Sequence, residues 1–506
     1  MILDTSTVHG DLTLAADVCV VGSGAGGSVV AAELARGGKS VVLLEEGHYW
    51  TSDDFTQREE EMYPRLYRER GTKPTADYTV LVSQGRALGG STLVSFCLCF
   101  RTPHQILAYW SERFGLDELS HEAMFPYFER VERRIGVKEM GPDQTNANNR
   151  VLMRGAERLG FRGRFMRHNR TECLGCGYCV IGCAYDRKGD ALTTHLAAAS
   201  KAGARIVPDA HVDAVRHERG AVTGVQGRFV RSKSTKRFAL RVNAPTVVLA
   251  AGALESPMLW FRSRLPDPHR LAGRNLRLHP HVVVAGVFEE TIAFWQGIPQ
   301  SYVVDEFLNL DKSVDGGFLT IAAAAQPIGA AALLPGLGRD HRRLMDGYAR
   351  TAGIACFLHD RSAGQVTADA RGQAVIEYRL NDEDKRDVMN AMRRGVEILF
   401  AAGARSVVLP YNDLVELHQR SAAKVIDDRG ILANDPLFVS FHPQGTLPMG
   451  RDARVSMVDS FGAAHGMKGL YVADASVFPT SVAVPPQLTV MALATRTAEW
   501  ILQAKP

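Results

Sequence analysis

The order of hydrophobic and polar positions in the first fifty residues predicts a strand, a helix and a second strand. Residues 17–21 and 40–44 are short, nearly continuous apolar runs, which are typical of strands buried in a sheet. Residues 25–36, which lie between them, are predicted to form a helix. Two parallel strands need such a crossover connection, so this segment is predicted to be a βαβ unit.

The same pattern predicts further elements along the chain. Helices are expected over residues 105–135, from Asn381 to Gly403 and from about 487 to 501; short strands are expected over 205–227 and 244–252. Asn381 is a good N-cap, and Val388, Met392, Val396 and Leu399 put apolar groups on one face of its helix. Residues 50–80 are polar, contain prolines and suit a surface excursion or a lid.

These elements predict an α/β fold in which a Rossmann-type nucleotide-binding domain is interrupted by an α+β substrate domain with a mostly antiparallel sheet. A chain of 506 residues also favours two domains over one. The expected nucleotide-binding domain is discontinuous, over 1–108, 201–285 and 440–506. A helical, cysteine-rich insertion is expected over 109–200, and the substrate domain over 286–439.

Composition and charge exclude several classes of partner. The 59 Lys and Arg residues nearly balance 55 Asp and Glu residues, and the net charge of +4 argues against binding to nucleic acid or an anionic membrane. The first residues lack the basic and apolar regions of a signal peptide. The most apolar stretch, 321–335, is interrupted by Gln326, Pro327 and Gly329, so no membrane span is expected. A cytoplasmic location with reduced thiols is predicted.

A dinucleotide-binding fingerprint follows the first predicted strand and opens the helix. In Gly22-Ser-Gly24-Ala25-Gly-Gly27, the first glycine allows the tight turn, the second lets a pyrophosphate approach the backbone, and the third permits close helix–strand packing. Glu45 ends the second strand, where a carboxylate can accept hydrogen bonds from both ribose hydroxyls. Because this acid disfavours a 2′-phosphate, FAD or NAD is expected rather than NADP.

Five further motifs, in order along almost the whole chain, resemble those of the glucose–methanol–choline (GMC) flavin oxidoreductases. They are Gln84-Gly-Arg86-Ala-Leu-Gly-Gly90-Ser91-Thr, Gly252-Ala-Leu-Glu-Ser-Pro257, Gly273-Arg-Asn-Leu-Arg-Leu-His279-Pro, His442-Pro-Gln-Gly-Thr446 and Gly469-Leu-Tyr-Val-Ala-Asp474-Ala475. The resemblance implies FAD as the cofactor, with Gly22, Gly24, Ala25, Gly27 and Glu45 on the ADP half. It places Val212 by the adenine, and it adds Arg86, Gly90, Ser91, Ser95, Asp474, Ala475 and Gln487 as cofactor contacts, several of them by the ribityl chain and ring.

Two positions depart from the family pattern. Ser95 stands where the family usually has Asn. More seriously, Pro485 occupies the position of the His or Asn that partners the active-site histidine over the flavin, and it offers neither a polar side chain nor a backbone N–H. A second contact to the substrate oxygen must therefore come from elsewhere.

The resemblance places the active-site histidine at His442. When hydride leaves an alcohol carbon for flavin, the hydroxyl proton needs an acceptor, and a neutral imidazole can serve as this general base. His279 and His281 are expected to be structural. The main alternative chemistry is a C–C dehydrogenation or a redox-neutral isomerisation. Either reaction would use the same base but would not need two side chains to hold a hydroxyl.

Four cysteines form a compact run with the C-x2-C-x2-C-x3-C spacing of bacterial ferredoxins: Cys173, Cys176, Cys179 and Cys183. Gly175, Gly177 and Gly182 would let this loop wrap a 3Fe-4S or 4Fe-4S cluster. Zinc, or no metal at all, is the alternative. The other cysteines, Cys19, Cys97, Cys99 and Cys356, are interpreted as small buried hydrophobic residues.

Taken together, these motifs predict an FAD-dependent dehydrogenase that oxidises an alcohol, with electrons leaving through the cluster to a protein or quinone acceptor. An oxidase that uses oxygen directly, with a structural cysteine loop, is the first rival. A flavin-binding module without turnover, marked by Pro485, is the second.

Overall fold

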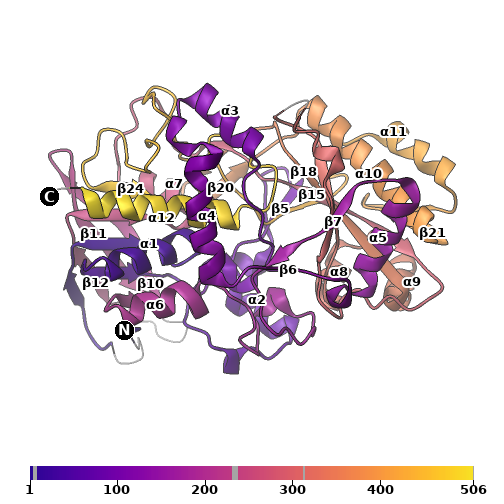
Figure 1. The fold of residues 1–506 in the computed structure, drawn as a ribbon, viewed down its shortest axis with the longest axis horizontal. Helices are drawn as coiled ribbons and strands as arrows, with labels where there is room; N and C mark the ends of the chain where they lie inside the picture. Colours follow the sequence, from indigo (N-terminus) through magenta and orange to yellow (C-terminus); the bar gives the residue numbers. More distant parts are fainter. Residues whose placement is uncertain (4–7, 231–237, 312–313, 505–506) are drawn as a thin grey trace.

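The computed structural model describes residues 1–3, 8–230, 238–311 and 314–504, and it confirms the predicted α/β fold (Figure 1). Five parallel strands form one sheet in the order β24-β13-β2-β3-β9. Their bounds are Leu470–Val472, Thr246–Leu249, Val18–Val21, Val41–Leu44 and Arg205–Val207. The strands β2 and β3 are buried at every position, which is why their sequences are continuously apolar.

Segments far apart in the sequence meet at this sheet. Helix α1 (Ala25–Arg36) joins β2 to β3 as predicted, and it packs beside α12 (Gln487–Gln503) from the other end of the chain (Figure 1). Of the strands expected over 205–227, β10 (Ala210–Glu218) and β11 (Ala221–Phe229) form an antiparallel pair that continues into β12 (Ala239–Asn243) and β1 (Leu12–Ala15). The N- and C-terminal segments thus build one nucleotide-binding half.

The other half contains a large sheet, which is mostly antiparallel as predicted. Its main path is β4 (Lys73–Pro74), β5 (Val80–Val82), β23 (Phe438–Ser440), β15 (His281–Val287), β18 (Thr351–Leu358), β17 (Phe318–Ala322), β16 (Tyr302–Val304) and β7 (Gly163–Phe165), with β21 (Ser406–Leu409) and β22 (Val415–Leu417) attached to β15. Of these pairs only β5 and β23 run parallel within the described residues.

The smaller sheets and remaining helices complete the fold. The short strands are β14 (Arg274–Leu276), β19 (Gly364–Ala368), β20 (Ala374–Glu377), β6 (Lys138–Glu139) and β8 (Arg167–His168). The remaining helices are α2 (Glu59–Leu66), α3 (His104–Phe114), α4 (His121–Ile135), α5 (Ala147–Leu159), α6 (Ala197–Lys201), α7 (Gly252–Arg262), α8 (Pro327–Leu333), α9 (Arg339–Asp346), α10 (Asp382–Ala402) and α11 (Val425–Arg429). None of the described helices is long and apolar enough to cross a membrane.

Helix α10 confirms the expected capping. The Asn381 side chain accepts a hydrogen bond from the backbone N–H of Asp384, and Gly403 ends the helix with φ of 102°. The predicted helical segment 105–135 is two helices, because Gly115 adopts a left-handed conformation (φ 66°) between α3 and α4. Buried side chains of α3 and α4 pack with the parallel sheet, whereas those of α5 pack with the large sheet.

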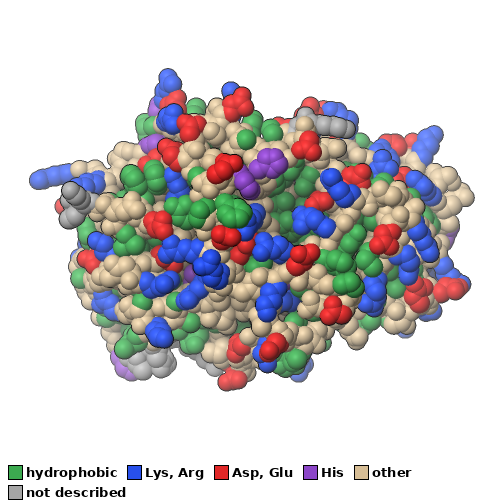
Figure 2. All heavy atoms as spheres, viewed as in Figure 1, with side chains coloured by type: hydrophobic (Ala, Val, Ile, Leu, Met, Phe, Trp, Pro, Cys, Tyr) green, Lys and Arg blue, Asp and Glu red, His purple; other side chains and the backbone are tan. Residues whose placement is uncertain are grey.

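The polar segment 50–80 is more deeply packed than its composition suggests. Met62 and Leu66 of α2 are fully buried and contact Ile181 of the cysteine-rich loop in a small hydrophobic cluster. Three glutamates at the start of α2 dominate its composition, while its few apolar side chains face inward. On the outer surface, basic and acidic side chains are interspersed on the face in Figure 2, in line with the nearly balanced charge.

Candidate active site

The glycine-rich turn between β2 and α1 brings the backbone to the edge of a cavity of about 300 Å³. Gly22 has φ of 102°, and a Cβ there would lie 2.2 Å from the carbonyl oxygen of Ala250. A Cβ on Gly27 would lie 2.0 Å from the oxygen of Gly22, so Gly27 serves helix–strand packing and lies behind the cavity wall. A Cβ on Gly24 would meet nothing within 4 Å, which leaves that backbone open for a phosphate to approach.

All the other predicted cofactor contacts line this one cavity. They are Gly22, Gly24, Ala25, Glu45, Arg86, Gly90, Ser91, Ser95, Val212, Asp474, Ala475 and Gln487. The Asp474 carboxylate accepts hydrogen bonds from the backbone N–H groups of Ser476 and Gly252 at 2.8 and 2.9 Å, which joins the family's C-terminal motif to the start of α7. These residues come from six separate stretches of sequence, and three of them, Gly22, Glu45 and Asp474, follow the carboxyl ends of the parallel strands β2, β3 and β24.

Glu45 also holds the glycine-rich turn. Its carboxylate accepts hydrogen bonds from the backbone N–H and the hydroxyl of Ser23 at 3.0 and 2.6 Å, and from the N–H of Gly47 at 2.7 Å. Burial raises the pKa of Glu45, and these hydrogen bonds oppose the rise. The carboxylate therefore fixes the turn from within the cavity wall.

The neighbouring Glu46, which sequence reasoning passed over, organises the basic side chains of the cavity. It forms ion pairs with Arg68 at 2.5 Å and with the predicted contact Arg86 at 3.2 Å. Burial alone would raise the pKa of Glu46, but a hydrogen bond from His211 and the charges of Arg68 and Arg86 hold it below its ordinary value. Two consecutive acids after a strand were the only sequence signal for this cluster.

The residues present fit FAD. The open backbone at Gly24 and the N-terminus of α1 suit a pyrophosphate, and Glu45 and Val212 lie on the same cavity wall. At the start of α12, the buried Nε2 of Gln487 has no hydrogen-bond partner among the described residues, although it lines the cavity. Such an orphaned donor suits a polar ring edge.

His442 follows β23 and lines the cavity, and a second histidine contacts it. The Nδ1 atoms of His442 and His279 are 2.9 Å apart, and their rings stack with centroids 5.0 Å apart. Phe357 stacks on His442 with a centroid distance of 6.0 Å. Enclosure by protein lowers the pKa of His442 to about 3, so the imidazole is neutral at ordinary pH.

The contact with His279 constrains the tautomers of both rings. Between two neutral imidazoles, one Nδ1 must donate and the other must accept. If His442 donates from Nδ1, its Nε2 carries the free lone pair that a base needs, and His279 accepts. His279 was expected to be only structural; its side chain is buried, and its backbone adopts φ of 48°. Nothing in the sequence pattern indicates this contact, which joins residues 163 positions apart.

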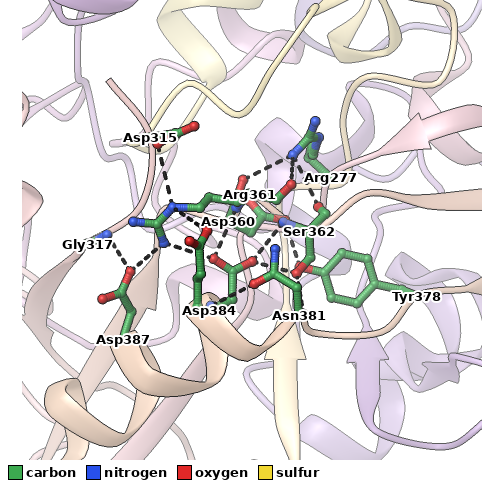
Figure 3. A network of polar contacts seen from close by, with 11 residues as sticks. Arg277, Asp315, Gly317, Asp360, Arg361, Ser362, Tyr378, Asn381, Asp384 and Asp387 are labelled. Atoms are coloured by element: carbon green, nitrogen blue, oxygen red, sulfur yellow. Dashed lines mark hydrogen bonds and ion pairs between the residues drawn. The ribbon is translucent and has the colours of Figure 1, made fainter. Parts of the chain in front are cut away.

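Figure 3 shows a polar network around Asp360 and Asp384, and Asp360 of this network also binds the backbone N–H of His279. Asp360 accepts hydrogen bonds from the backbone N–H groups of Leu278 and His279 at 2.8 and 3.2 Å, and from the hydroxyl of Tyr378 at 2.8 Å. Next to it, Asp384 at the start of α10 accepts a hydrogen bond from the backbone N–H of Ser362 at 2.7 Å. The network thus ties the loop before β15 to α10.

The four clustered cysteines line a second, much smaller cavity of about 20 Å³, together with Cys97 and Arg170. Backbone N–H groups of Gly175 and Arg187 point at the sulfurs of Cys173 and Cys183 at 3.5 and 3.3 Å. Gly175, Gly177 and Gly182 all have positive φ, as the tight loop requires. No group of three His, Cys, Asp or Glu side chains is arranged to hold a metal ion in the described ranges. The thiols therefore share a cavity without forming a closed ligand set.

The two cavities share a wall. The large cavity is lined by Ser95, Phe96, Leu98 and Val180. The small cavity is lined by Cys97 and Cys179, which are their neighbours in the sequence. Cys97 is buried, as expected of a small hydrophobic residue, but its backbone has φ of 69° and its side chain faces the other thiols.

Comparison with known proteins gives the family. Residues 63–281 and 360–494 match the description "GMC oxidoreductase", and residues 20–59 match "NAD(P)-binding Rossmann-like domain". An uncharacterized GMC-type oxidoreductase of Mycobacterium tuberculosis is 35% identical over 492 residues, which cover 96% of this chain and 75% of that protein. A long-chain-alcohol oxidase of Arabidopsis thaliana is 29% identical over 522 residues, which cover 97% of this chain and 68% of that protein.

Solved structures agree on the fold. Pyridoxine 4-oxidase from Mesorbium loti matches with a TM-score of 0.72 at 20% identity, covering 97% of this chain and 100% of that one. Formate oxidase from Aspergillus oryzae matches with a TM-score of 0.71 at 17% identity, covering 98% and 99%. The sequence relative, which is more than one third identical over nearly the whole chain, and the two matched stretches show that this protein belongs to the GMC family of FAD-dependent oxidoreductases.

Proposed function

We propose that this enzyme is an FAD-dependent dehydrogenase that oxidises a hydrophobic alcohol, with His442 as the base. The observation that carries the proposal is the 2.9 Å contact between His442 and His279 on the wall of the cavity that also holds the dinucleotide fingerprint. A neutral imidazole with a fixed tautomer is suited to accept a hydroxyl proton at that wall.

The same cavity supports the predicted contacts with the cofactor. Gly22 and Gly24 would approach the pyrophosphate, Gly27 would support them from behind, and Glu45 and Val212 would lie by the ribose and adenine. The remaining residues would hold the ribityl chain and ring: Arg86, Gly90, Ser91, Ser95, Asp474, Ala475 and Gln487. When bound, FAD would accept the hydride from the carbinol carbon as the carbonyl forms.

His442 would take the hydroxyl proton at Nε2 while its Nδ1–H donates to His279. The imidazolium that results keeps this second hydrogen bond, so the charge that forms on His442 is shared with a buried, neutral neighbour. Because burial lowers the pKa of His442 to about 3, the ring would release the proton readily once the product leaves. The alcohol thus gives one proton to His442, and its carbinol carbon would give one hydride to FAD.

The apolar side chains that line the cavity favour a hydrophobic substrate. Around His442 the lining includes Phe96, Leu98, Phe357 and Phe441, and Phe357 contacts the ring directly. Relatives in Arabidopsis thaliana, 28–29% identical to this chain, are named long-chain-alcohol oxidases. We therefore propose a long-chain primary alcohol as the first substrate to test.

The direct test is anaerobic reduction of the bound flavin by a series of 1-alkanols, followed by loss of its visible absorbance. The proposal expects bleaching that becomes more efficient with chain length. Bleaching by unsaturated or steroid substrates alone would favour C–C dehydrogenation or isomerisation. No bleaching by any alcohol, amine or steroid would indicate a flavin-binding protein without turnover.

His442→Ala tests the base. We expect the rate of flavin reduction to fall by about 10²- to 10⁴-fold, the usual share of a general base. His121→Ala is the matched control, because His121 is exposed on α4 and lies outside the cavity. A His442→Ala rate equal to that of the control would remove His442 from the mechanism.

A second proposal concerns the cysteine loop: Cys173, Cys176, Cys179 and Cys183 would hold an iron–sulfur cluster that passes electrons to a protein or quinone acceptor. Support comes from the four thiols around one cavity, from the N–H groups aimed at Cys173 and Cys183, and from the wall shared with the flavin cavity. The loop would have to close further around the cluster, because the thiols do not yet form a closed ligand set.

Metal analysis separates the alternatives. Iron with acid-labile sulfide, and visible absorbance beyond the flavin bands, would support the cluster. Stoichiometric zinc, or no metal, would overturn it and leave a structural loop. Peroxide formed in air during alcohol oxidation would instead indicate an oxidase that passes electrons directly to oxygen.

A further inference from the structure

One guanidinium on the wall of the large cavity has no carboxylate partner. Arg262 ends α7, is partly buried and lines the cavity, and its guanidinium forms no ion pair with any carboxylate of the described residues. The two other guanidiniums of this wall are paired, because Arg68 and Arg86 both contact Glu46, at 2.5 and 3.2 Å. A charge is costly to bury without a partner. Such a group is explained if a ligand contacts it.

Hydrogen bonds place Arg262 beside the predicted adenine wall. Its Nη2 donates to the carbonyl oxygen of Val212 at 3.5 Å, and Val212 on β10 is the residue expected by the adenine. The end of α7 is fixed to the same strand, since the hydroxyl of Ser263 accepts a hydrogen bond from the N–H of Val215 at 2.8 Å. The same hydroxyl donates to the carbonyl oxygen of Leu259 at 2.6 Å. Helix and strand therefore hold Arg262 next to Val212.

The length of α7 separates Arg262 from the glycine-rich turn. Glu255, Leu259 and Arg262 follow helical spacing, and all three line the cavity, so one face of the helix forms part of its wall. The first residue of the helix, Gly252, lies by the glycine-rich turn. With a rise of 1.5 Å per residue, Arg262 is about 15 Å further along the helix axis. It thus belongs to the adenine end of the cavity, away from the turn that suits the pyrophosphate.

The ion pairs of this wall leave Arg262 out. Besides Glu46, Arg68 contacts Glu255 at 3.6 Å, so both acids already serve other guanidiniums. Burial lowers the pKa of Arg262, and the more distant charges of Glu255 and Glu46 oppose this effect. Arginine still stays protonated in proteins, so Arg262 keeps its charge. A guanidinium is flat and weakly hydrated, and it stacks well on aromatic rings.

We propose that the guanidinium of Arg262 stacks on the adenine ring of FAD. The carbonyl of Val212 holds one edge of the planar group, and a ring that contacts Val212 meets the guanidinium beside it. The open backbone at Gly24 and the N-terminus of α1 serve the pyrophosphate at the other end. The inference rests on the proposed cofactor contacts and is independent of the alcohol substrate. Arg262 is a binding residue and takes no part in hydride or proton transfer.

The test compares three variants of the purified full-length holoenzyme. Arg262→Met keeps an unbranched side chain and removes the flat cation, whereas Arg262→Lys keeps the charge and removes the flat group. The matched control is Arg264→Met. Arg264 is exposed, lies two positions further along the chain and does not line the cavity.

Equilibrium dialysis of each holoenzyme against graded FAD gives the dissociation constant of FAD, and added ADP as competitor gives that of ADP. We expect Arg262→Met to weaken both by about 10- to 30-fold, the range of one desolvated cation–π contact. Arg262→Lys should recover only part of this affinity, and Arg264→Met should stay within about twofold of wild type. Equal constants for Arg262→Met and Arg264→Met would overturn the proposal. Full recovery in Arg262→Lys would also overturn it, because charge alone would then suffice.

The same measurements separate this inference from the proposed function. If the wild-type protein binds neither FAD nor ADP, the proposed cofactor contacts fail; if it binds both and only the Arg262 variants behave like the control, the stacking contact alone fails. Should Arg262→Met be isolated without flavin, urea unfolding with and without ADP measures the same contact. ADP should then protect Arg264→Met at a concentration that does not protect Arg262→Met, and equal protection would overturn the proposal.

Discussion

Replacing Asp360 with asparagine perturbs the polar network in Figure 3, which binds the backbone N–H of His279, the residue in contact with the candidate base. The Asp360 side chain is 1% exposed, and both of its oxygens accept backbone N–H groups, from Leu278 at 2.8 Å and from His279 at 3.2 Å. Burial raises the pKa of this carboxyl, and the charge of Arg277 together with the donors opposes the rise. The site is thus arranged for a carboxylate with two accepting oxygens.

Asparagine has only one accepting oxygen. If that oxygen serves Leu278 and Tyr378, the NH₂ group faces the N–H of His279, and a buried backbone donor loses its acceptor. This loss costs about 1–3 kcal/mol, and removing the negative charge beside Arg277 adds to it. We expect Asp360→Asn to lower the free energy of unfolding by about 3–4 kcal/mol. Displacement of His279 should also slow flavin reduction by about 10- to 100-fold, because His442 loses its fixed orientation.

Tyr378→Phe is the matched control. It removes one hydrogen bond to the same carboxylate, worth about 1–2 kcal/mol, and leaves the N–H of His279 paired. Urea unfolding followed by far-UV circular dichroism gives the stability of each variant, and anaerobic flavin reduction gives the rate. Equal stability losses in the two variants, with unchanged turnover in Asp360→Asn, would refute the role of Asp360 in holding His279.

Three further changes test other parts of the structure. Gly22→Ala should abolish flavin binding, whereas Gly10→Ala, where a Cβ meets nothing within 4 Å, should leave the flavin content of the purified protein unchanged. Burial lowers the pKa of His195 to about 3, so below pH 6.5 the unfolded chain binds a proton that the folded chain does not, and stability is lost as the pH falls. In urea titrations between pH 7 and pH 5, His195→Gln should therefore lose about 1 kcal/mol less per pH unit than wild type; an unchanged slope would refute this. Glu132→Gln, which breaks bidentate pairs with Arg101 and Arg167, should lower the free energy of unfolding by about 3–5 kcal/mol, whereas Asp452→Asn on an exposed pair should change it little in the same assay.

What the sequence predicted correctly was local. The βαβ unit and α10 depend on short-range patterns: apolar runs, one glycine-rich turn, an Asn cap and a terminal Gly. The fingerprint and the family motifs named the predicted cofactor contacts, and all but Gly27 line one cavity; Gly22, Glu45 and Asp474 do so because parallel strands end at the same edge. Their roles toward FAD remain predictions, as do the domain limits.

What the sequence could not predict depends on strand register. Strand β15 pairs with β23 so that His281 lies opposite Val439, and in an antiparallel pair this places the loop before β15 beside the residues after β23. His279 reaches His442 for that reason alone. His279 lies within a family motif, but that motif does not indicate which residue its side chain contacts.

One side chain connects the cysteine loop to the flavin cavity whatever the loop binds. The side-chain nitrogen of Lys188, which is 3% exposed, donates hydrogen bonds to the carbonyl oxygens of Leu93, Ser95 and Cys179 at 2.8, 2.8 and 2.7 Å. Two of these carbonyls lie just after the first family motif, and the third belongs to the cysteine run. A charged donor shared among three buried acceptors holds both segments rigidly. Removing the amine, as in Lys188→Met, should therefore loosen the wall beside the flavin cavity, and the flavin content of the purified protein, measured by its visible absorbance, should fall.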